Sequence, residues 1–163
     1  AKVIALGRHE KRMQIARELG ADLIVNPEDS DWMDQVRDHT PNGRGVDFAF
    51  ECSGFPYYQQ KCLDTLKFYG TMIQLGYASD LGPDLKWALN TEYGLCWGHK
   101  TITAHFDVNF NHRTSLVETL KNPWIQSMVD RLVTHDLPMS QAAEAFELLN
   151  QKEAGKVFFR PFE

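Results

Sequence analysis

The sequence lacks the features that mark membrane proteins, disulfide-rich proteins and nucleic-acid-binding proteins. No apolar run in its 163 residues approaches the ~20 residues that a membrane span needs. The three cysteines are an odd number at irregular spacing, which indicates neither a disulfide framework nor a zinc cluster. Basic residues number 17 against 22 acidic ones, and no segment concentrates them as phosphate binding requires. We therefore expect a protein of the reducing cytoplasm, with neither a membrane nor nucleic acid as a partner.

Common catalytic motifs are absent as well. The sequence has no G-x-S-x-G nucleophile turn, no P-loop and no H-E-x-x-H metal motif. His105 and Asp107 alternate on a predicted strand with His112 close behind, which is one arrangement that can hold a metal. We favour the other interpretation, in which these are polar residues at a strand end. No metal ligands are therefore assigned in this chain.

What the sequence does contain is a regular alternation of predicted strands and helices. Residues 2–6 form a nearly continuous apolar run, typical of a strand covered on both faces. The stretch "HEKRMQIARELG" then shows helical spacing of its apolar residues and ends at Gly20, where a helix C′ glycine belongs. "DLIVNP" and "DSDWMDQVRDH" repeat the pattern, with Asp and Ser as capping candidates.

The alternation continues after turn chemistry at "TPNGRG". Val46–Glu51 is predicted as a strand, "PYYQQKCLDTLKF" as a helix that Gly70 closes, and "TMIQLG" as the next strand. Such alternation predicts right-handed βαβ crossovers and therefore an α/β fold with a doubly wound parallel sheet. The remaining predicted elements are a strand in "KTITAHFDV", helices in "HRTSLVETL" and "SQAAEAFELLNQ", and a final strand in "KVFFRP".

Several of these segments carry a resemblance to a known family. "VDFAFECSG", "GTMIQLGY", "RLVTHDLPMSQAAEAFELLNQKEAGKVFFRP" and the opening strand through "ELGAD" resemble the second half of the medium-chain dehydrogenase/reductase family, the zinc-type alcohol, polyol and glucose dehydrogenases. The resemblance implies a truncated Rossmann-type domain for a nicotinamide dinucleotide over residues 1–106. Residues 107–163 then form a C-terminal α/β tail, which in the family packs on a separate catalytic domain.

The resemblance also assigns residues to the two ends of the cofactor. Gly7 matches the family's ribose-binding acidic residue, Arg8 lies beside the adenosine 2′ position, and Arg12 matches a basic residue that often reaches the same ribose. The backbone passes the adenosine side at Cys52, Ser53 and Gly54, and it passes the nicotinamide at Leu75, Gly76 and Tyr77. Asn109, in "DVNFN", resembles an asparagine near the nicotinamide in glucose dehydrogenases.

The pair Gly7 and Arg8 predicts a preference for NADP over NAD. A carboxylate at position 7 would accept hydrogen bonds from ribose hydroxyls and would repel a 2′-phosphate, whereas glycine leaves space there. Arg8 can offer a bidentate fork to that phosphate. From the residues alone, a turn glycine beside a solvated arginine is the simpler interpretation. The family resemblance reverses that preference.

A glycine-rich turn, which should present backbone N–H groups to the pyrophosphate, is missing. No G-x-G-x-x-G occurs in the chain, so we expect the Rossmann domain to be incomplete at its N-terminus. In the strand order 3-2-1-4-5-6 the missing first strand is central, and it would leave two unpaired inner edges. An omitted N-terminal half, a partner subunit, or a rearranged sheet that closes the two edges on each other would fill the gap.

Two functional hypotheses follow. The first is the cofactor-binding portion of an NAD(P)-dependent oxidoreductase that transfers hydride between nicotinamide and an alcohol, polyol or sugar, inactive alone because the family's zinc ligands lie in the missing half. The second is a non-catalytic binding or interaction module. In the family, the strand at residues 101–106 pairs with its twin in a homodimer, and "KTITAHF" alternates suitably for that role.

Overall fold

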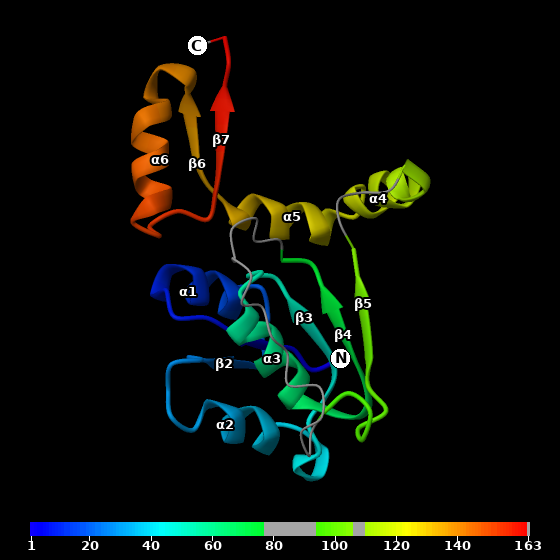
Figure 1. Ribbon diagram of the computed structural model, residues 1–163. Coiled ribbons are helices and arrows are strands. Elements are labelled where there is room, and N and C mark those ends of the chain that lie inside the picture. Colours follow the sequence, from blue (N-terminus) through cyan, green and yellow to red (C-terminus); the bar gives the residue numbers. More distant parts are fainter. Residues whose placement is uncertain (77–93, 106–109, 163) are drawn as a thin grey trace. The chain divides into compact units, whose positions relative to one another are not determined.

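A computed structural model describes residues 1–76, 94–105 and 110–162, and strands alternate with α-helices from β1 to β4 (Figure 1). The strands are β1 (Ile4–Leu6), β2 (Leu23–Val25), β3 (Val46–Glu51), β4 (Leu66–Gln74), β5 (Thr101–Ala104), β6 (Val133–Pro138) and β7 (Lys156–Arg160). The α-helices are α1 (Glu10–Glu18), α2 (Trp32–Asp38), α3 (Pro56–Thr65), α4 (Arg113–Leu120), α5 (Pro123–Leu132) and α6 (Ala142–Asn150). Short 3-10 turns lie at Pro41–Gly43, Phe110–His112 and Met139–Gln141.

The chain forms two compact units. Unit 1 consists of Ala1–Asp29 together with Val108–Glu163, and unit 2 consists of the continuous segment Ser30–Asp107. All strand pairs in the described residues are parallel, which confirms the predicted α/β class. No helix among those residues is both long enough and apolar enough to cross a membrane.

Unit 2 is built on a parallel sheet in the order β3-β4-β5, with α3 against one face (Figure 1). The helix begins with Pro56 at its first turn, where the missing N–H costs nothing. Ala49 and Met72 point from the sheet toward Leu63 and form a buried core with it. On the opposite face, Phe48 and Phe50 of β3 are each 62% exposed among the residues that the structure describes.

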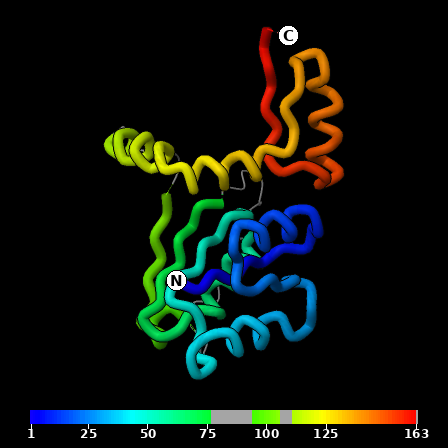
Figure 2. Tube along the Cα trace, turned by 180° about the vertical axis from the view of Figure 1, so that it is seen from behind, coloured from blue at the N-terminus to red at the C-terminus, as the bar shows by residue number. Residues whose placement is uncertain are grey.

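Unit 1 holds two separate pairs of parallel strands, β1-β2 and β6-β7. Figure 2 shows the β6-β7 pair beside α6 near the red end of the chain. The strand β6 contacts both β7 and α6. The helix α1 ends as predicted, because Gly20 follows its C-cap with a φ of +94°. The backbone carbonyl of Glu18 accepts a hydrogen bond from Arg131 Nη1 at 2.9 Å, which ties α1 to α5.

Three local predictions are wrong. The segment at residues 2–6 is not covered on both faces, because Val3 and Leu6 are 51% and 44% exposed in a pair of only two strands. Asp31 occupies the N-cap of α2 without capping it, since its carboxylate accepts from Gln35 Nε2 instead. The helix α3 stops at Thr65 rather than near Gly70.

The boundary between α3 and β4 differs from the prediction because the aromatic stretch after Thr65 joins the sheet. Leu66 leaves the helix with a ψ of 138° and pairs with Val46, and the strand runs on through Gln74. Tyr69 has a φ of +61°, within an irregular part of the register. Gly70 therefore lies inside a strand, where aromatic neighbours favour extended structure.

The strand order agrees with an interrupted Rossmann sheet. The β1-β2 pair lies in unit 1 and the β3-β4-β5 sheet lies in unit 2. What replaces the missing first strand, whether an omitted N-terminal half, a partner subunit or a rearranged sheet, stays a prediction. The division into a cofactor domain at residues 1–106 and a tail at 107–163 also stays a prediction.

Candidate functional site

The loop at residues 52–54 is held by the carboxylate of Glu51, the last residue of β3. Glu51 is only 2% exposed. It accepts hydrogen bonds from the backbone N–H of Ser53 at 2.7 Å, from the Ser53 hydroxyl, and from the backbone N–H of Gly54 at 2.9 Å. A buried carboxylate requires such donors, because desolvation without them is costly. One side chain thus fixes the backbone path of this loop.

The same residue holds the loop that follows β4. The backbone carbonyl of Glu51 accepts from the N–H groups of Leu75 and Gly76, each at 2.8 Å. Gln74 Nε2 donates at 2.7 Å both to the Glu51 carboxylate and to the Gly76 carbonyl. Gln74 Oε1 is buried and has no hydrogen-bond partner among the described residues, while the amide nitrogen donates to both acceptors. The two loops therefore form one hydrogen-bonded assembly.

Glycines allow the two loops of unit 2 to touch. A Cβ on Gly76 would collide with the backbone nitrogen of Gly54 and would lie 2.7 Å from the carbonyl carbon of Cys52. Gly54 itself has a φ of +75°, a conformation that favours glycine. The structure thus brings together five of the predicted residues, namely Cys52, Ser53, Gly54, Leu75 and Gly76.

The sequence reasoning missed Glu51 and Gln74. The available signal was an acidic residue at the end of an apolar strand, "VDFAFE", directly before a loop that contains Ser and Gly. A carboxylate at the carboxyl end of a buried strand needs donors, and the nearest are the N–H groups of the following turn.

In unit 1, Gly7 and Arg8 follow β1 at the edge where β2 also ends. Gly7 N–H donates to the Val25 carbonyl at 3.1 Å, which places the turn after β1 beside the turn after β2. The space next to Gly7 is not open, since a Cβ there would collide with the end of the Met13 side chain and lie 2.6 Å from its Sδ. The prediction that Gly7 leaves space thus needs a correction: Met13, from α1, fills that space.

Arg8 is held by an ion pair that the sequence did not reveal. Its Nη1 lies 2.5 Å from Oε1 of Glu28, and both side chains are about half exposed. Glu28 follows β2 and lies 20 residues after Arg8 in sequence. No periodic pattern links the two positions, which is why the pair was missed.

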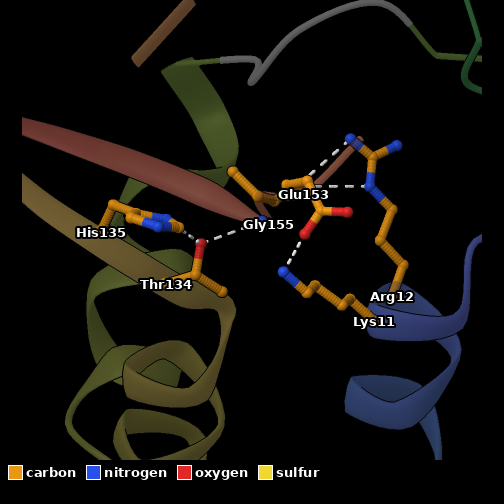
Figure 3. A network of polar contacts seen from close by, with 7 residues as sticks. Lys11, Arg12, Thr134, His135, Glu153 and Gly155 are labelled. Atoms are coloured by element: carbon orange, nitrogen blue, oxygen red, sulfur yellow. Dashed lines mark hydrogen bonds and ion pairs between the residues drawn. The ribbon is translucent and has the colours of Figure 1, made fainter. Parts of the chain in front are cut away.

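Arg12 lies on α1 and points toward the segment that precedes β7 (Figure 3). Its Nε and Nη2 donate weakly to the Ala154 carbonyl, at 3.4 and 3.3 Å, while the neighbouring Lys11 pairs with Glu153. An open cavity of about 530 Å³ lies beside these contacts. It is lined by Glu10, Lys11, Arg12, Gln14, Ile15, Thr134, His135, Glu153 and Gly155.

Two predicted residues, Tyr77 and Asn109, lie outside the described residues. The others fall into one group per unit: Gly7, Arg8 and Arg12 in unit 1, and the five loop residues at 52–54 and 75–76 in unit 2. Within each unit the group stands at or next to the carboxyl ends of parallel strands, where open α/β sheets bind ligands.

Comparison with known proteins now decides the family. The model of the zinc-binding dehydrogenase family matches residues 1–121. The chain belongs to this family. It is 29% identical to the L-threonine 3-dehydrogenase of Symbiobacterium thermophilum and 30% identical to an alcohol dehydrogenase of Cupriavidus necator, over 98% of the chain in both cases. These results confirm the resemblance that the sequence motifs predicted.

A solved structure extends this zinc-binding dehydrogenase assignment to the fold. The chain matches the crystal structure of an alcohol dehydrogenase from Thermotoga maritima with a TM-score of 0.85 at 27% identity, over 99% of the chain. The chain spans only 44% and 42% of the two relatives and 43% of this structure. The Rossmann-like fold class is therefore confirmed for the part of the family that this chain represents.

The described residues offer no zinc site, although the family is named for zinc. Among residues 1–76, 94–105 and 110–162, no group of three His, Cys, Asp or Glu side chains could hold a metal ion. Burial, and then the Glu51 carboxylate, raises the pKa of the Cys52 thiol, which disfavours the thiolate that ligates metals. No reaction step through zinc can be derived from these residues.

Proposed function

We propose that this chain is the cofactor-binding portion of an NAD(P)-dependent oxidoreductase that transfers hydride between nicotinamide and an alcohol, polyol or sugar. The observation that carries the proposal is the Glu51 assembly, which holds the loops at 52–54 and 75–76 together at the carboxyl ends of β3 and β4. A dinucleotide bound along that edge would supply the hydride chemistry. The chain's own residues bind and orient it, and catalysis requires groups beyond the described residues.

The proposal includes a preference for NADP over NAD. Its support is a guanidinium, Arg8, in the turn after β1, with no carboxylate at position 7. A guanidinium presents a planar fork of donors that matches a phosphate. The end of the Met13 side chain lies beside Gly7, where an acidic side chain would contact the ribose of NAD. The cavity beside Arg12 has a size typical of ligand sites.

The proposal also covers partners and location. The outer edge of β5 pairs with no described strand, and its Thr101 and Thr103 are exposed, which supports a homodimer through residues 101–106. All three cysteines are free, which supports the reducing cytoplasm. A second candidate function, a non-catalytic dimeric binding or interaction module, rests on the same exposed edge.

A fluorescence titration tests the proposal. The purified 163-residue chain is titrated with NADPH and with NADH, beside an Arg8→Ala variant and an Arg17→Ala control. Arg17 is a suitable control because it is also half exposed and ion-paired, with Glu10 at 2.7 Å. We expect Arg8→Ala to weaken NADPH binding about tenfold, the equivalent of about 1.4 kcal/mol, because a charge-assisted contact is lost. NADH binding should change less than about twofold.

The outcomes separate the two functions. Saturable binding of either nucleotide supports the cofactor-binding role, and selective loss in Arg8→Ala supports the NADP preference. If neither nucleotide binds and the chain sediments as a homodimer, the interaction module is the better description. If Arg17→Ala weakens NADPH binding as much as Arg8→Ala does, the effect is general electrostatics and the role of Arg8 is rejected.

A further inference from the structure

Arg8, the residue proposed to bind the 2′-phosphate, pairs with an acidic residue that does not stand at position 7. It is Glu28, which reaches Arg8 from the neighbouring turn with 2.5 Å between Oε1 and Nη1. The geometry is set by the backbone: Gly7 N–H bonds the Val25 carbonyl, so the turns after β1 and β2 lie side by side. Glu28 N–H donates to Asn26 Oδ1 at 3.1 Å, which shapes its turn.

We propose that Glu28 is a specificity-determining residue, which weakens the binding of a 2′-phosphorylated dinucleotide by competing for the Arg8 guanidinium. The inference rests on the proposed cofactor-binding function and deepens it. The chain then carries both a cation that attracts the 2′-phosphate and a carboxylate that opposes it. Glu28 thus limits how strongly NADP is preferred over NAD.

The competition follows from charge and geometry. A guanidinium has five N–H donors, and one edge of Arg8 already faces the Glu28 carboxylate. A phosphate monoester carries close to two negative charges at neutral pH, so it is repelled by a carboxylate that shares its cation. An unphosphorylated ribose carries no such charge. Removal of the Glu28 charge should therefore help NADPH and leave NADH nearly unchanged.

The exposure of the pair sets the size of the effect. Both side chains are about half exposed, at 53% for Arg8 and 55% for Glu28, so water and salt screen the repulsion. We expect Glu28→Gln to tighten NADPH binding about fivefold at low ionic strength, with most of the gain lost in ~0.5 M KCl. NADH binding should stay within about twofold of the unsubstituted chain at both salt concentrations.

The experiment compares five forms of the 163-residue chain by NADPH and NADH titration: unsubstituted, Glu28→Gln, Arg8→Ala, Arg8→Ala with Glu28→Gln, and Glu118→Gln. Glu118→Gln is the matched control, because Glu118 is an exposed acid that pairs with Lys121 in the same unit. The proposal expects the gain in Glu28→Gln, its disappearance in the Arg8→Ala background, and no gain in Glu118→Gln. Thermal unfolding of each form verifies that all are folded.

Other outcomes overturn the proposal, and they do so in distinguishable ways. If Arg8→Ala weakens NADPH binding but Glu28→Gln leaves it unchanged or weakens it, Glu28 does not compete, while the proposed function stands. An equal gain in Glu118→Gln shows that overall charge is responsible, and the role of Glu28 is then rejected. If NADH binds but NADPH binds to none of the forms, the NADP preference and the role of Glu28 fall while the cofactor-binding function stands. If neither nucleotide binds to any form, the proposed function and the role of Glu28 both fall.

Discussion

The two groups of candidate cofactor residues are held in opposite ways. In unit 2 the buried Glu51 binds both loops through its carboxylate and its backbone carbonyl. In unit 1 the half-exposed side chains of Arg8 and Lys11 are held by ion pairs with Glu28 and Glu153. Exposed pairs typically contribute about 0.2–1 kcal/mol, whereas stripping donors from a buried acceptor costs several times more. The hydrogen bonds of a buried carboxylate thus hold the unit 2 loops, whereas the unit 1 charges are held by exposed ion pairs.

Removal of the Glu51 carboxylate should have the largest effect. In Glu51→Ala, the Gly54 N–H and the Gln74 amide lose their shared acceptor inside the protein. We expect the free energy of unfolding to fall by about 3–5 kcal/mol, since each unsatisfied buried donor costs about 1–3 kcal/mol. Urea unfolding followed by circular dichroism measures the loss. The unit 1 counterpart, Glu28→Ala, should cost less than about 1 kcal/mol. Equal losses of stability in the two variants would contradict the view that the buried carboxylate holds its loops more strongly than the exposed ion pair does.

A Cβ added at Gly76 tests how tightly the unit 2 loops are packed. Gly76→Ala would force a Cβ against the backbone of Gly54 and Cys52, which cannot rotate away, so we expect a loss of about 2–3 kcal/mol. The control is Gly20→Ala in unit 1, where φ is +94° but nothing lies within 4 Å of an added Cβ. It should cost only about 1 kcal/mol, from backbone strain alone. Thermal or urea unfolding measures both, and a control that matches Gly76→Ala would show that crowding is unimportant.

Ionisation of Cys62, in α3 of unit 2, should make the smallest of these three changes in the free energy of unfolding. Burial, followed by the charge of Glu51, raises the pKa of its thiol from 9.0 to about 12. Between these values the unfolded chain loses the thiol proton while the folded chain keeps it, so stability falls as pH rises above 9.0. At pH 10 we expect about 1.4 kcal/mol less stability from this group than at pH 7. A Cys62→Ala variant should lack that increment in urea unfolding at the two pH values. The same pH dependence in both forms would contradict the prediction.

The sequence predicted the parts of the fold in which local pattern and tertiary structure agree. The strand Val46–Glu51 and the end of α1 at Gly20 follow from apolar periodicity and a C′ glycine, and both are confirmed. The end of α3 could not be predicted, because "LKFYG" suits either a helix end or a strand. Pairing of Leu66 with Val46 decides it, and that contact is not local in sequence.

The sequence motifs predicted where the candidate loops lie, but they did not predict which side chains hold or contact those loops. Family motifs located the loops at 52–54 and 75–76, and the structure brings these loops together. The roles of Glu51, Met13 and Glu28 depend on which side chains meet across strands and turns. Neither spacing nor residue type encodes such meetings, since they arise from the parallel register of the sheets.

The division of the chain into units has a consequence for the order of folding. Unit 2 is one continuous segment, Ser30–Asp107, whereas unit 1 joins Ala1–Asp29 to residues that begin at Val108. Contacts such as Arg12 with Ala154 therefore close a loop that contains all of unit 2, at an entropic cost of about 4 kcal/mol for a flexible chain. During synthesis, unit 2 can fold as soon as Asp107 has emerged, and its folding shortens that loop. The early strand β1 belongs to a unit that is complete only when the later segment is present, so we expect unit 1 to fold after unit 2.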